Sequence, residues 1–419
     1  MGIKKIPLST QIIAAMAIGV AWAFLQKPFP ELVSFTSHWI QPLGKIFIKL
    51  LFLIAVPLVF SSLIVGMGGL KSATELKTIG RNTLLVFLTT LVSATLIGTS
   101  LAYLIQPGKH IMAGPLTYEA VAFDKSVKEN MHKNAEESVI ETFSSAIPDN
   151  IIHSLGNNSM MLQVVIIAFI LGIALSRMNN ESKKPIMSLF ESIQHWFTEA
   201  IHLVMIISPL GVFALVASLD LDATILLSLA LYMFTVILGL GIMLFIVYPL
   251  CFTTLGKTGY VEFFTKSRAV LIMAFSTSSS NATLPLTLNV VKEKFNVPDN
   301  ISNFVVSVGS TINMDGTALY KCVAVYFIAQ SMGVELSLAQ MLIIVLTSIA
   351  STAGAAGIPG AGMITLVIIL QSVGLPAESI VLILAPDRLL DMFRTVVNVA
   401  GDISTSLCVN GLSQGEKLD

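Results

Sequence analysis

The strongest chemical signal in the chain is a stripe of polar side chains close to its C-terminus. Asp387, Asp391, Arg394, Asn398 and Asp402 follow one another at spacings of 4, 3, 4 and 4 residues, which places them on one face of an α-helix. If this otherwise apolar helix lies in a bilayer, each buried charge costs at least about 2.5–3.5 kcal/mol. A stripe of four charges then indicates function, and the alternative is a self-contained ion network, for example between Asp391 and Arg394.

A second polar segment, Asn313 to Thr317, interrupts the apolar run from Phe304 to Gln330. Gly316 is placed to unwind a helix here and to free backbone carbonyls. Carboxylate, amide and carbonyl oxygens are the ligands of a small, hard cation such as sodium. A transition metal is disfavoured, because all six histidines lie elsewhere and no Cys/His spacing fits a zinc site.

The composition places these segments in a lipid bilayer. Of the 419 residues, 54% are apolar and only 12% are charged, against roughly 25% charged residues in a soluble domain. The net charge of −1 offers no attraction for nucleic acid. The three cysteines all lie in apolar stretches, which is typical of small hydrophobic residues rather than of disulfide partners.

The first 255 residues contain six apolar runs that can cross a membrane. They are Ile12 to Leu25, Ile40 to Leu70, Leu84 to Ile105, Ile151 to Ser176, Phe197 to Leu219 and Ala223 to Phe252. The first run follows Lys4 and Lys5 like a signal peptide, but the later runs favour a retained helix. Lys and Arg concentrate in alternate loops, which predicts cytoplasmic termini and an external loop from Gly108 to Asn150.

Two later segments predict re-entrant helical hairpins. Ser276 to Asn281 divides the apolar run from Ala269 to Val291 into arms that reach only about half of the bilayer. Ala350 to Gly362 interrupts the run from Met341 to Leu370 with glycines and a proline, which are tolerated at this depth only against protein or a water-filled cavity. Flanking charges predict that the first hairpin enters from the cytoplasm and the second from outside.

Each hairpin precedes a helix of unusual polar content, which is the pattern of an inverted repeat around a substrate site. The alternative, helices packed through small residues, does not explain why polar groups concentrate in these four segments. Four aspartates and three basic residues leave this core near a charge of −1: Asp315, Asp387, Asp391, Asp402, Lys321, Arg388 and Arg394. An anionic substrate would need cations beside it, which favours symport.

Four stretches together resemble the dicarboxylate/amino acid:cation symporter family, which includes bacterial glutamate and aspartate transporters and the mammalian excitatory amino acid transporters. They are Ser276 to Pro285, Thr311 to Tyr320, Ala355 to Gly362 and Asp387 to Asp402. The resemblance covers about Leu50 to Asn410. It implies a homotrimer in the inner membrane of a prokaryote, in which a transport domain moves across the bilayer within a rigid scaffold.

The fold implied by the resemblance is all-α, with about eight transmembrane helices and two opposed re-entrant hairpins. Residues 1–255 would form mainly the scaffold, with the third helix (about 83–105) and the sixth (about 223–252) packed on the transport domain. The transport core, 256–412, would comprise hairpin 1 (about 258–292), helix 7 (about 298–330), hairpin 2 (about 335–371) and helix 8 (about 376–412). Residues 413–419 would be a cytoplasmic tail.

The resemblance also assigns a substrate pocket. Arg394 would bind a side-chain carboxylate of the substrate, which suits a guanidinium because it binds bidentately and stays charged. Asp391 would accept the α-amino group, with Asn398 and Thr395 as partners of the α-carboxylate and amino group. The other implied pocket residues are Thr317, Ser278, Ser279, Ser280, Ile358 and Gly362. Neutral carriers lack the arginine and C4-dicarboxylate carriers lack the aspartate, so we expect an acidic amino acid.

Three sodium sites follow from the same resemblance. The first would use Gly309, Asn313, Asn398 and Asp402, and the second Thr311 and Met314 with carbonyls of Thr352, Ala353 and Ala355. The third would use Asp315, Asn313 and Thr90 with a tyrosine and a serine. Phe87 and Leu91 stand at those last two positions, so the third site lacks two side-chain oxygens.

Lys321 stands where relatives carry Glu or Gln, and we expect it to share a helix face with Asn313 and Thr317. The hypothesis is a tethered cation that neutralises the empty transport domain and replaces a proton or potassium in the return step. The alternatives are a salt bridge to Asp387 and a lysine that snorkels outward.

The sequence therefore predicts a secondary active transporter that takes up aspartate or glutamate with sodium by alternating access. It needs no cofactor besides the co-transported ions. The alternatives are a proton-coupled glutamate or C4-dicarboxylate symporter and an ion channel. An enzyme is disfavoured, since no His or Lys base lies near Ser278 to Ser280 in the sequence.

Overall fold

The computed structural model describes residues 8–68, 76–109, 147–157, 160–219, 223–352 and 360–415, and within these ranges the regular structure is entirely helical. This confirms the predicted all-α class. The first ten helices are α1 (Leu8–Gln26), α2 (Pro30–Phe35), α3 (Gln41–Gly68), α4 (Leu76–Ile105), α7 (Ile151–Leu155), α8 (Met161–Arg177), α9 (Asn180–Ile206), α10 (Ser208–Ala217), α11 (Ala223–Ile242) and α12 (Tyr248–Thr254). Two π-helical turns, η1 (Thr36–Ile40) and η3 (Met243–Val247), join α2 to α3 and α11 to α12.

The C-terminal part contains two helical hairpins and the helices that follow them. Its helices are α13 (Tyr260–Thr277), α14 (Ser280–Asn289), α15 (Asp299–Ile312), α16 (Asp315–Ser331), α17 (Leu338–Thr352), α18 (Ala361–Ser372) and α19 (Val381–Gly415). A π-helical turn, η4 (Val290–Lys294), extends α14, and a 3₁₀ turn, η5 (Ala377–Ile380), precedes α19. The alternation of hairpin and helix is the order that the sequence predicts.

Two of the predicted spans are interrupted. The run from Ile151 to Ser176 divides into α7 and α8, and α9 and α10 meet at an angle of 55°. Pro209 is the second residue of α10, and its ring has no N–H to continue the α9 ladder and disfavours helical backbone at the residue before it. The bend therefore follows from the Ser208-Pro209 dipeptide.

By length and composition, three described helical segments can cross a membrane: Pro30–Val65, Thr78–Ile105 and Thr224–Thr254. The bent pair α9 and α10 supplies a fourth if it is one span. Predicted helix 7 does not qualify because it breaks between α15 and α16. Predicted helix 8 is continuous in α19, but it carries the charged stripe from Asp387 to Asp402.

The entering arm of the first hairpin extends beyond the apolar run that begins at Ala269, and it starts close to residue 258, where the resemblance places the hairpin. Its helix α13 begins at Tyr260 and has 18 residues, so it includes polar residues that the apolar run excludes. Glu262 and Lys266 form an (i, i+4) ion pair at 2.6 Å on this first part, which supports a helix there. The chain turns at Ser278, whose φ of 51° is left-handed, and α14 begins two residues later.

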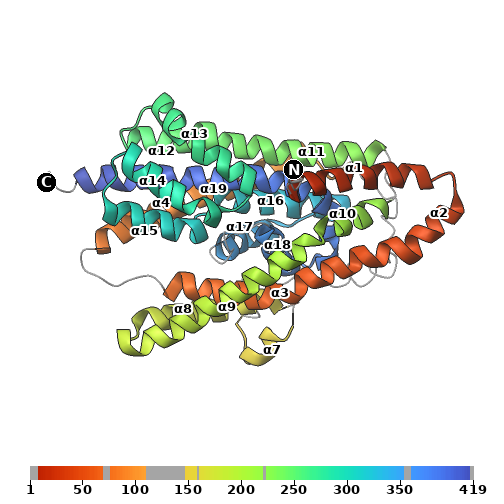
Figure 1. The fold of residues 1–419 in the computed structure, drawn as a ribbon, viewed down its shortest axis with the longest axis horizontal. Coiled ribbons are helices and arrows are strands. Elements are labelled where there is room, and N and C mark those ends of the chain that lie inside the picture. The colour runs from red at the N-terminus through yellow and green to blue at the C-terminus, as the bar shows by residue number, and fades with distance from the viewer. Residues whose placement is uncertain are drawn as a thin grey trace, which may run out of the picture.

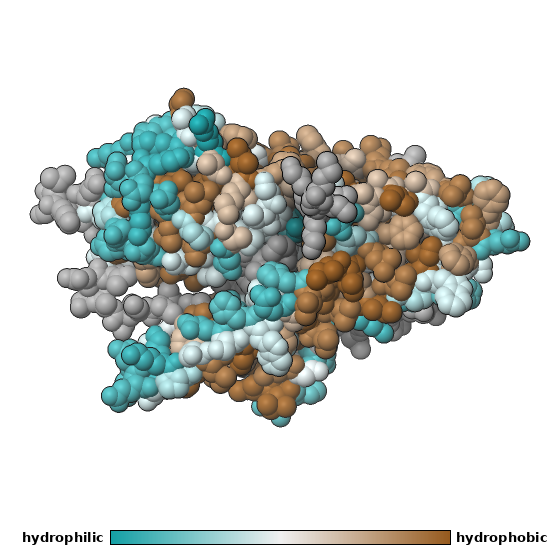
Figure 2. Space-filling model, viewed as in Figure 1, coloured by the Kyte–Doolittle hydropathy of each residue, from teal (hydrophilic) through white to brown (hydrophobic). Residues whose placement is uncertain are grey.

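The helices bury two large hydrophobic clusters. One joins α4 and α11 to the hairpins, α16 and α19, and the other joins α1, α3, α8, α9 and α10. Figure 1 shows α19 running along the long axis of the molecule with α11 beside it. Figure 2 shows hydrophilic residues gathered at the end with α12 to α15, and hydrophobic residues over the middle and opposite end. The division into scaffold and transport domain stays a prediction.

Close backbone contact between α4 and α16 depends on Gly98. A Cβ on this residue would lie 2.7 Å from the carbonyl oxygen of Leu319, which cannot move without shifting α16. Gly98→Ala should therefore lower stability by about 1–3 kcal/mol, despite the better helix propensity of alanine. Gly241→Ala is the matched control, because a Cβ there meets nothing within 4 Å. Melting of the detergent-purified variants tests this, and equal melting temperatures for both variants would contradict it.

Candidate functional site

The polar stripe lies on α19 and is buried along its whole length. Its five residues, from Asp387 to Asp402, are at most 7% exposed. Helix α16 packs along α19, and α13, α14 and α15 also contact it. The stripe thus faces the interior of the protein, as its spacing predicts.

Arg394 is the centre of an ion network. Its Nη2 donates to Oδ1 of Asp391 at 2.7 Å, and its Nη1 lies 3.0 Å from Oδ1 of Asp387. The second contact is not aligned as a hydrogen bond, so Nη1 and Nε both lack a hydrogen-bond acceptor among the described residues. The guanidinium is 1% exposed and lies 3.8 Å from the centre of the Tyr320 ring. The self-contained network considered as an alternative is therefore present, but it leaves buried donors unpaired.

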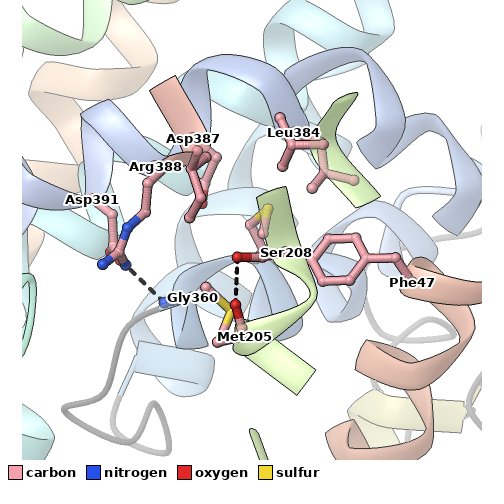
Figure 3. Close-up of a pocket in the computed structure, with 11 residues that line it drawn as sticks. Phe47, Met205, Ser208, Gly360, Leu384, Asp387, Arg388 and Asp391 are labelled. Atoms are coloured by element: carbon pink, nitrogen blue, oxygen red, sulfur yellow. Dashed lines mark hydrogen bonds and ion pairs between the residues drawn. The ribbon is translucent and has the colours of Figure 1, made fainter. Parts of the chain in front are cut away.

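Asp391 links this network to the second hairpin. Its Oδ2 accepts a hydrogen bond from the backbone N–H of Gly360 at 3.1 Å, and Nη1 of Arg388 lies 3.5 Å from the same oxygen. Figure 3 shows Asp391 on α19 with its hydrogen bond to Gly360 drawn as a dashed line. A Cβ on Gly362 would lie 3.0 Å from Nη1 of Arg394, so the start of α18 covers the guanidinium closely.

Asn398 joins α19 to the start of α16. Its Oδ1 accepts from the backbone N–H of Gly316 at 2.9 Å, and its Nδ2 donates to Oγ1 of Thr317 at 3.1 Å. The prediction that Gly316 unwinds the helix is wrong, because Gly316 lies in the first turn of α16. It is needed for close approach instead, since a Cβ there would lie 2.7 Å from the carbonyl oxygen of Arg394.

The chain is unwound at Asn313 and Met314, between α15 and α16. Asn313 therefore precedes the helix that carries Thr317 and Lys321 and does not continue its face. Its Nδ2 donates to Oδ1 of Asp402 at 3.2 Å, while its Oδ1 has no hydrogen-bond donor in the described part of the chain. Asp402 also lies against Gly309, where a Cβ would overlap its carboxylate.

Asp315 accepts a hydrogen bond from a tyrosine hydroxyl that the sequence did not predict. Tyr248 of α12 donates to its Oδ2 at 2.9 Å, and both residues are fully buried. Oδ1 of Asp315 has no hydrogen-bond donor among the described residues. Phe87 and Leu91, which stand in place of oxygen-bearing residues, are buried as well. The only sequence signal for Tyr248 was a tyrosine at the end of an apolar span.

The remaining residues of the predicted sodium sites lie close to the break between α15 and α16 or outside the described residues. Thr90 and Thr311 bond back to carbonyls of their own helices, at Phe87 and Val308, and Met314 is buried in the break. Thr352 is the last residue of α17. Ala353, Ala355 and Ile358 lie outside the described residues.

The serine tip of the first hairpin is buried, and its side chains have different roles. Ser279 is the N-cap of α14, where its Oγ accepts from the backbone N–H of Ala282 at 3.2 Å. An N-cap is a structural function, because its oxygen satisfies a backbone N–H at the start of the helix. Ser278 has an unpaired, buried Oγ, and Ser280 opens the helix. Thr395 donates its hydroxyl proton to the carbonyl of Asp391, so only its lone pairs are free.

A small cavity lies between the stripe and the helices of the other hydrophobic cluster. It has a volume of about 20 Å³ and is lined by Asp387, Arg388 and Asp391 together with Phe47, Ser208 and Gly360, among others. Figure 3 shows these side chains converging from α3, α10, α19 and the second hairpin. The space is sufficient for a water molecule, and an amino acid requires α18 or the facing helices to move.

Lys321 takes neither of the two alternative positions. It is 0% exposed, so it does not snorkel, and Asp387 pairs with Arg394 rather than with this lysine. Its Nζ donates to Oγ of Ser351 at 3.0 Å and to Oγ1 of Thr352 at 3.2 Å. The ammonium therefore contacts the last two residues of α17, in the second hairpin.

Comparison with known proteins identifies the class to which this fold and site belong. The model of the sodium:dicarboxylate symporter family matches residues 8–412, and the chain belongs to that family. The description of this family names symporters, which are proteins that move a substrate together with a co-transported ion.

Three characterised relatives are similar over almost the whole chain. Excitatory amino acid transporter 3 of Oryctolagus cuniculus is 31% identical over 96% of this chain and 85% of its own length. The proton/glutamate-aspartate symporter of Escherichia coli (strain K12) is 32% identical over 97% and 92%. The proton/sodium-glutamate symport protein of Bacillus subtilis (strain 168) is 32% identical over 95% and 91%.

Two glycines of the site should respond differently to an added methyl group. Gly316→Ala would press Cβ against the carbonyl oxygen of Arg394, whereas Gly362→Ala would meet the end of the Arg394 side chain. Backbone cannot yield as a guanidinium can, so Gly316→Ala should lose about 1–3 kcal/mol of stability and Gly362→Ala clearly less. Thermal melting in detergent measures the difference, and a larger loss for Gly362→Ala would disprove the packing argument.

Proposed function

We propose that this protein takes up an acidic amino acid, aspartate or glutamate, together with sodium by alternating access. The observation that carries the proposal is the buried guanidinium of Arg394, whose Nε and Nη1 have no hydrogen-bond acceptor among the described residues. Unpaired buried donors are costly. A carboxylate brought by the substrate would supply the acceptor that one of these two donors lacks, in a charge-assisted hydrogen bond.

The neighbouring groups suit the other end of an acidic amino acid. Asp391 is 7% exposed and already shares its two oxygens between Arg394 and Gly360. A substrate α-ammonium would offset this carboxylate once the substrate carboxylate engages Arg394. Asn398 and Thr395 lie on the same helix face and are placed to meet the α-carboxylate and the amino group. The names of the relatives, which specify glutamate or aspartate, support the same substrate class.

Sodium would be held where the chain is unwound between α15 and α16. The unpaired Oδ1 atoms of Asn313 and Asp315, together with Asp402 and the carbonyl of Gly309, form an oxygen-rich set suited to a hard cation. Thr311 and Met314 are the described residues left for the second site, since the Thr352 hydroxyl accepts a hydrogen bond from Lys321. Phe87 and Leu91 provide no side-chain oxygen for the third sodium site. The hydroxyl of Tyr248 is bonded to Asp315 of that site instead.

Opening and closing would be performed by the second hairpin. Its α18 begins against Arg394 and Asp391, so lifting this segment would expose the guanidinium. We infer that the assembly is a homotrimer in a prokaryotic inner membrane with both termini in the cytoplasm. Residues 256–412 would form the moving transport core, and residues 1–255 mainly the scaffold.

Removing the guanidinium should abolish uptake of acidic substrates. Arg394→Cys, assayed with labelled aspartate in proteoliposomes, should lose 2 kcal/mol or more of substrate binding, about 30-fold or more. The matched control is Arg268→Cys, which removes an exposed guanidinium on α13 and should transport normally. Gel filtration verifies that each variant is folded. Aspartate transport that is unchanged in Arg394→Cys would count against the pocket assignment.

Removing one carboxylate from the unwound segment should weaken sodium binding. Asp402→Asn would replace a buried carboxylate that contacts Asn313 and Gly309, and the sodium concentration for half-maximal uptake should rise about tenfold or more. Asp299→Asn is the control, since that side chain is 80% exposed. Normal sodium dependence in Asp402→Asn would remove this residue from the site.

Proton coupling is the second candidate, because the relatives from Escherichia coli and Bacillus subtilis have proton in their names. Uptake into proteoliposomes distinguishes the two ions. A sodium gradient at equal pH should drive accumulation of aspartate, and a pH gradient without sodium should not. The reverse result would establish proton coupling, and a failure to accumulate aspartate against its gradient would favour a channel.

A further inference from the structure

Lys321 is a buried cation that belongs to neither the substrate stripe nor its ion pairs. It lies in the middle of α16, and its ammonium reaches across to the last two residues of α17, Ser351 and Thr352, at 3.0 and 3.2 Å. All three residues are at most 1% exposed. In the described part of the chain, no carboxylate forms an ion pair with this lysine. Its polar partners are therefore the hydroxyls of the second hairpin.

The hydrogen bonds at this contact have one consistent direction. Ser351 and Thr352 both donate their hydroxyl protons to the carbonyl of Ser348, one turn earlier. Their lone pairs are left to accept, and an ammonium group can only donate. Ser348, Ser351 and Thr352 lie at spacings of three and four residues, so they present one face of α17 to α16.

The contact lies where α17 ends. The last carbonyls of a helix have no partner within the helix, and they give its C-terminal end a partial negative charge that favours a cation. This end is also a place that a mobile cation could occupy, since carbonyls and hydroxyls are hard ligands. Here the protein provides its own cation, on a side chain anchored to the neighbouring helix α16.

We propose that the Lys321 ammonium is the built-in cation of the second hairpin, which holds the end of α17 against α16 in place of one mobile cation. The hairpin then closes over the site with one sodium ion fewer than a neutral residue at position 321 would require. This inference rests on the proposed sodium-coupled transport. It assigns Lys321 as a positioning residue that acts through α17 rather than on the substrate.

The first test counts ions. Lys321→Gln and Lys321→Met, reconstituted in liposomes, should each transport aspartate with one additional sodium ion per substrate, measured from reversal potentials and from the Hill coefficient for sodium. Lys321→Met, which is flexible and apolar, is the second neutral variant if glutamine disturbs folding. Lys266→Gln, which removes a lysine from a surface ion pair on α13, is the control and should keep the wild-type ion count.

The second test uses a thiol that already lies in the same interface. Cys322 is 0% exposed, and its Sγ lies 3.4 Å from Oγ of Ser348 on α17. In a Cys251→Ala/Cys408→Ala background, a membrane-permeant thiol reagent should modify Cys322 about tenfold faster or more in the Lys321 variants without sodium, because hydrogen bonds to a charged donor are lost. Added sodium should slow the reaction again. Ser351→Ala/Thr352→Val, which removes the acceptors and keeps the lysine, should expose Cys322 as well.

The proposal requires both the additional sodium ion and the faster modification of Cys322. A wild-type sodium count in both neutral variants would overturn the built-in cation, and a wild-type rate at Cys322 in those variants and in Ser351→Ala/Thr352→Val would overturn the contact as a closing element. The proposed function fails separately, through absence of aspartate uptake by the wild-type protein under any gradient. The Cys322 rates need no transport and still decide the role of Lys321 in that case.

Discussion

The buried guanidinium of Arg394 constrains the rest of this structure. A fixed positive charge at 1% exposure is tolerable only with anions and aromatic faces around it, and the chain supplies Asp387, Asp391 and the ring of Tyr320. These partners come from α19 itself and from α16, so the two helices must stay in register. Gly362 allows the start of α18 to approach this group, and Gly316 allows α16 to approach the backbone of Arg394. The arginine thus determines which helices are adjacent and where side chains must be absent.

The position of the charges also explains why helices are broken in this half of the chain. A continuous apolar helix satisfies its backbone internally and offers nothing to an ion. At Asn313 and Met314 the backbone leaves the helix, and the side chains of Asn313, Asp315 and Asp402 gather beside the break. In the last described turn of α17, the hydroxyls of Ser351 and Thr352 accept hydrogen bonds from Lys321. Two helix ends inside one core therefore provide one place for mobile cations and one occupied by a side chain.

Periodicity predicted the parts of the fold that depend on burial alone. The stripe from Asp387 to Asp402 could be placed on one helix face because a polar residue in a bilayer must face protein, and the two hairpins followed from apolar arms too short to span. Details that depend on close packing were not accessible. Gly316 was interpreted as a helix breaker because the sequence does not show that Arg394 approaches it. The start of α13 could not be found from hydropathy because charged residues there are paired along the helix, whereas the resemblance places the hairpin from about residue 258.

Contacts between distant segments were the least predictable part of the site. Tyr248 lies 67 residues from Asp315 in the chain, and no spacing rule connects a tyrosine at the end of one span to an aspartate in another. Lys321 shows the same limit, since its place in an apolar segment was clear from the sequence but its hydrogen-bond partners were not. Hydropathy suggested an ion pair or an escape to the interface, because those are the usual solutions for a lysine in a membrane. The protein uses a third solution, in which the hydroxyls of Ser351 and Thr352 replace the carboxylate, and the role proposed for Lys321 makes its charge part of the hairpin's closed state.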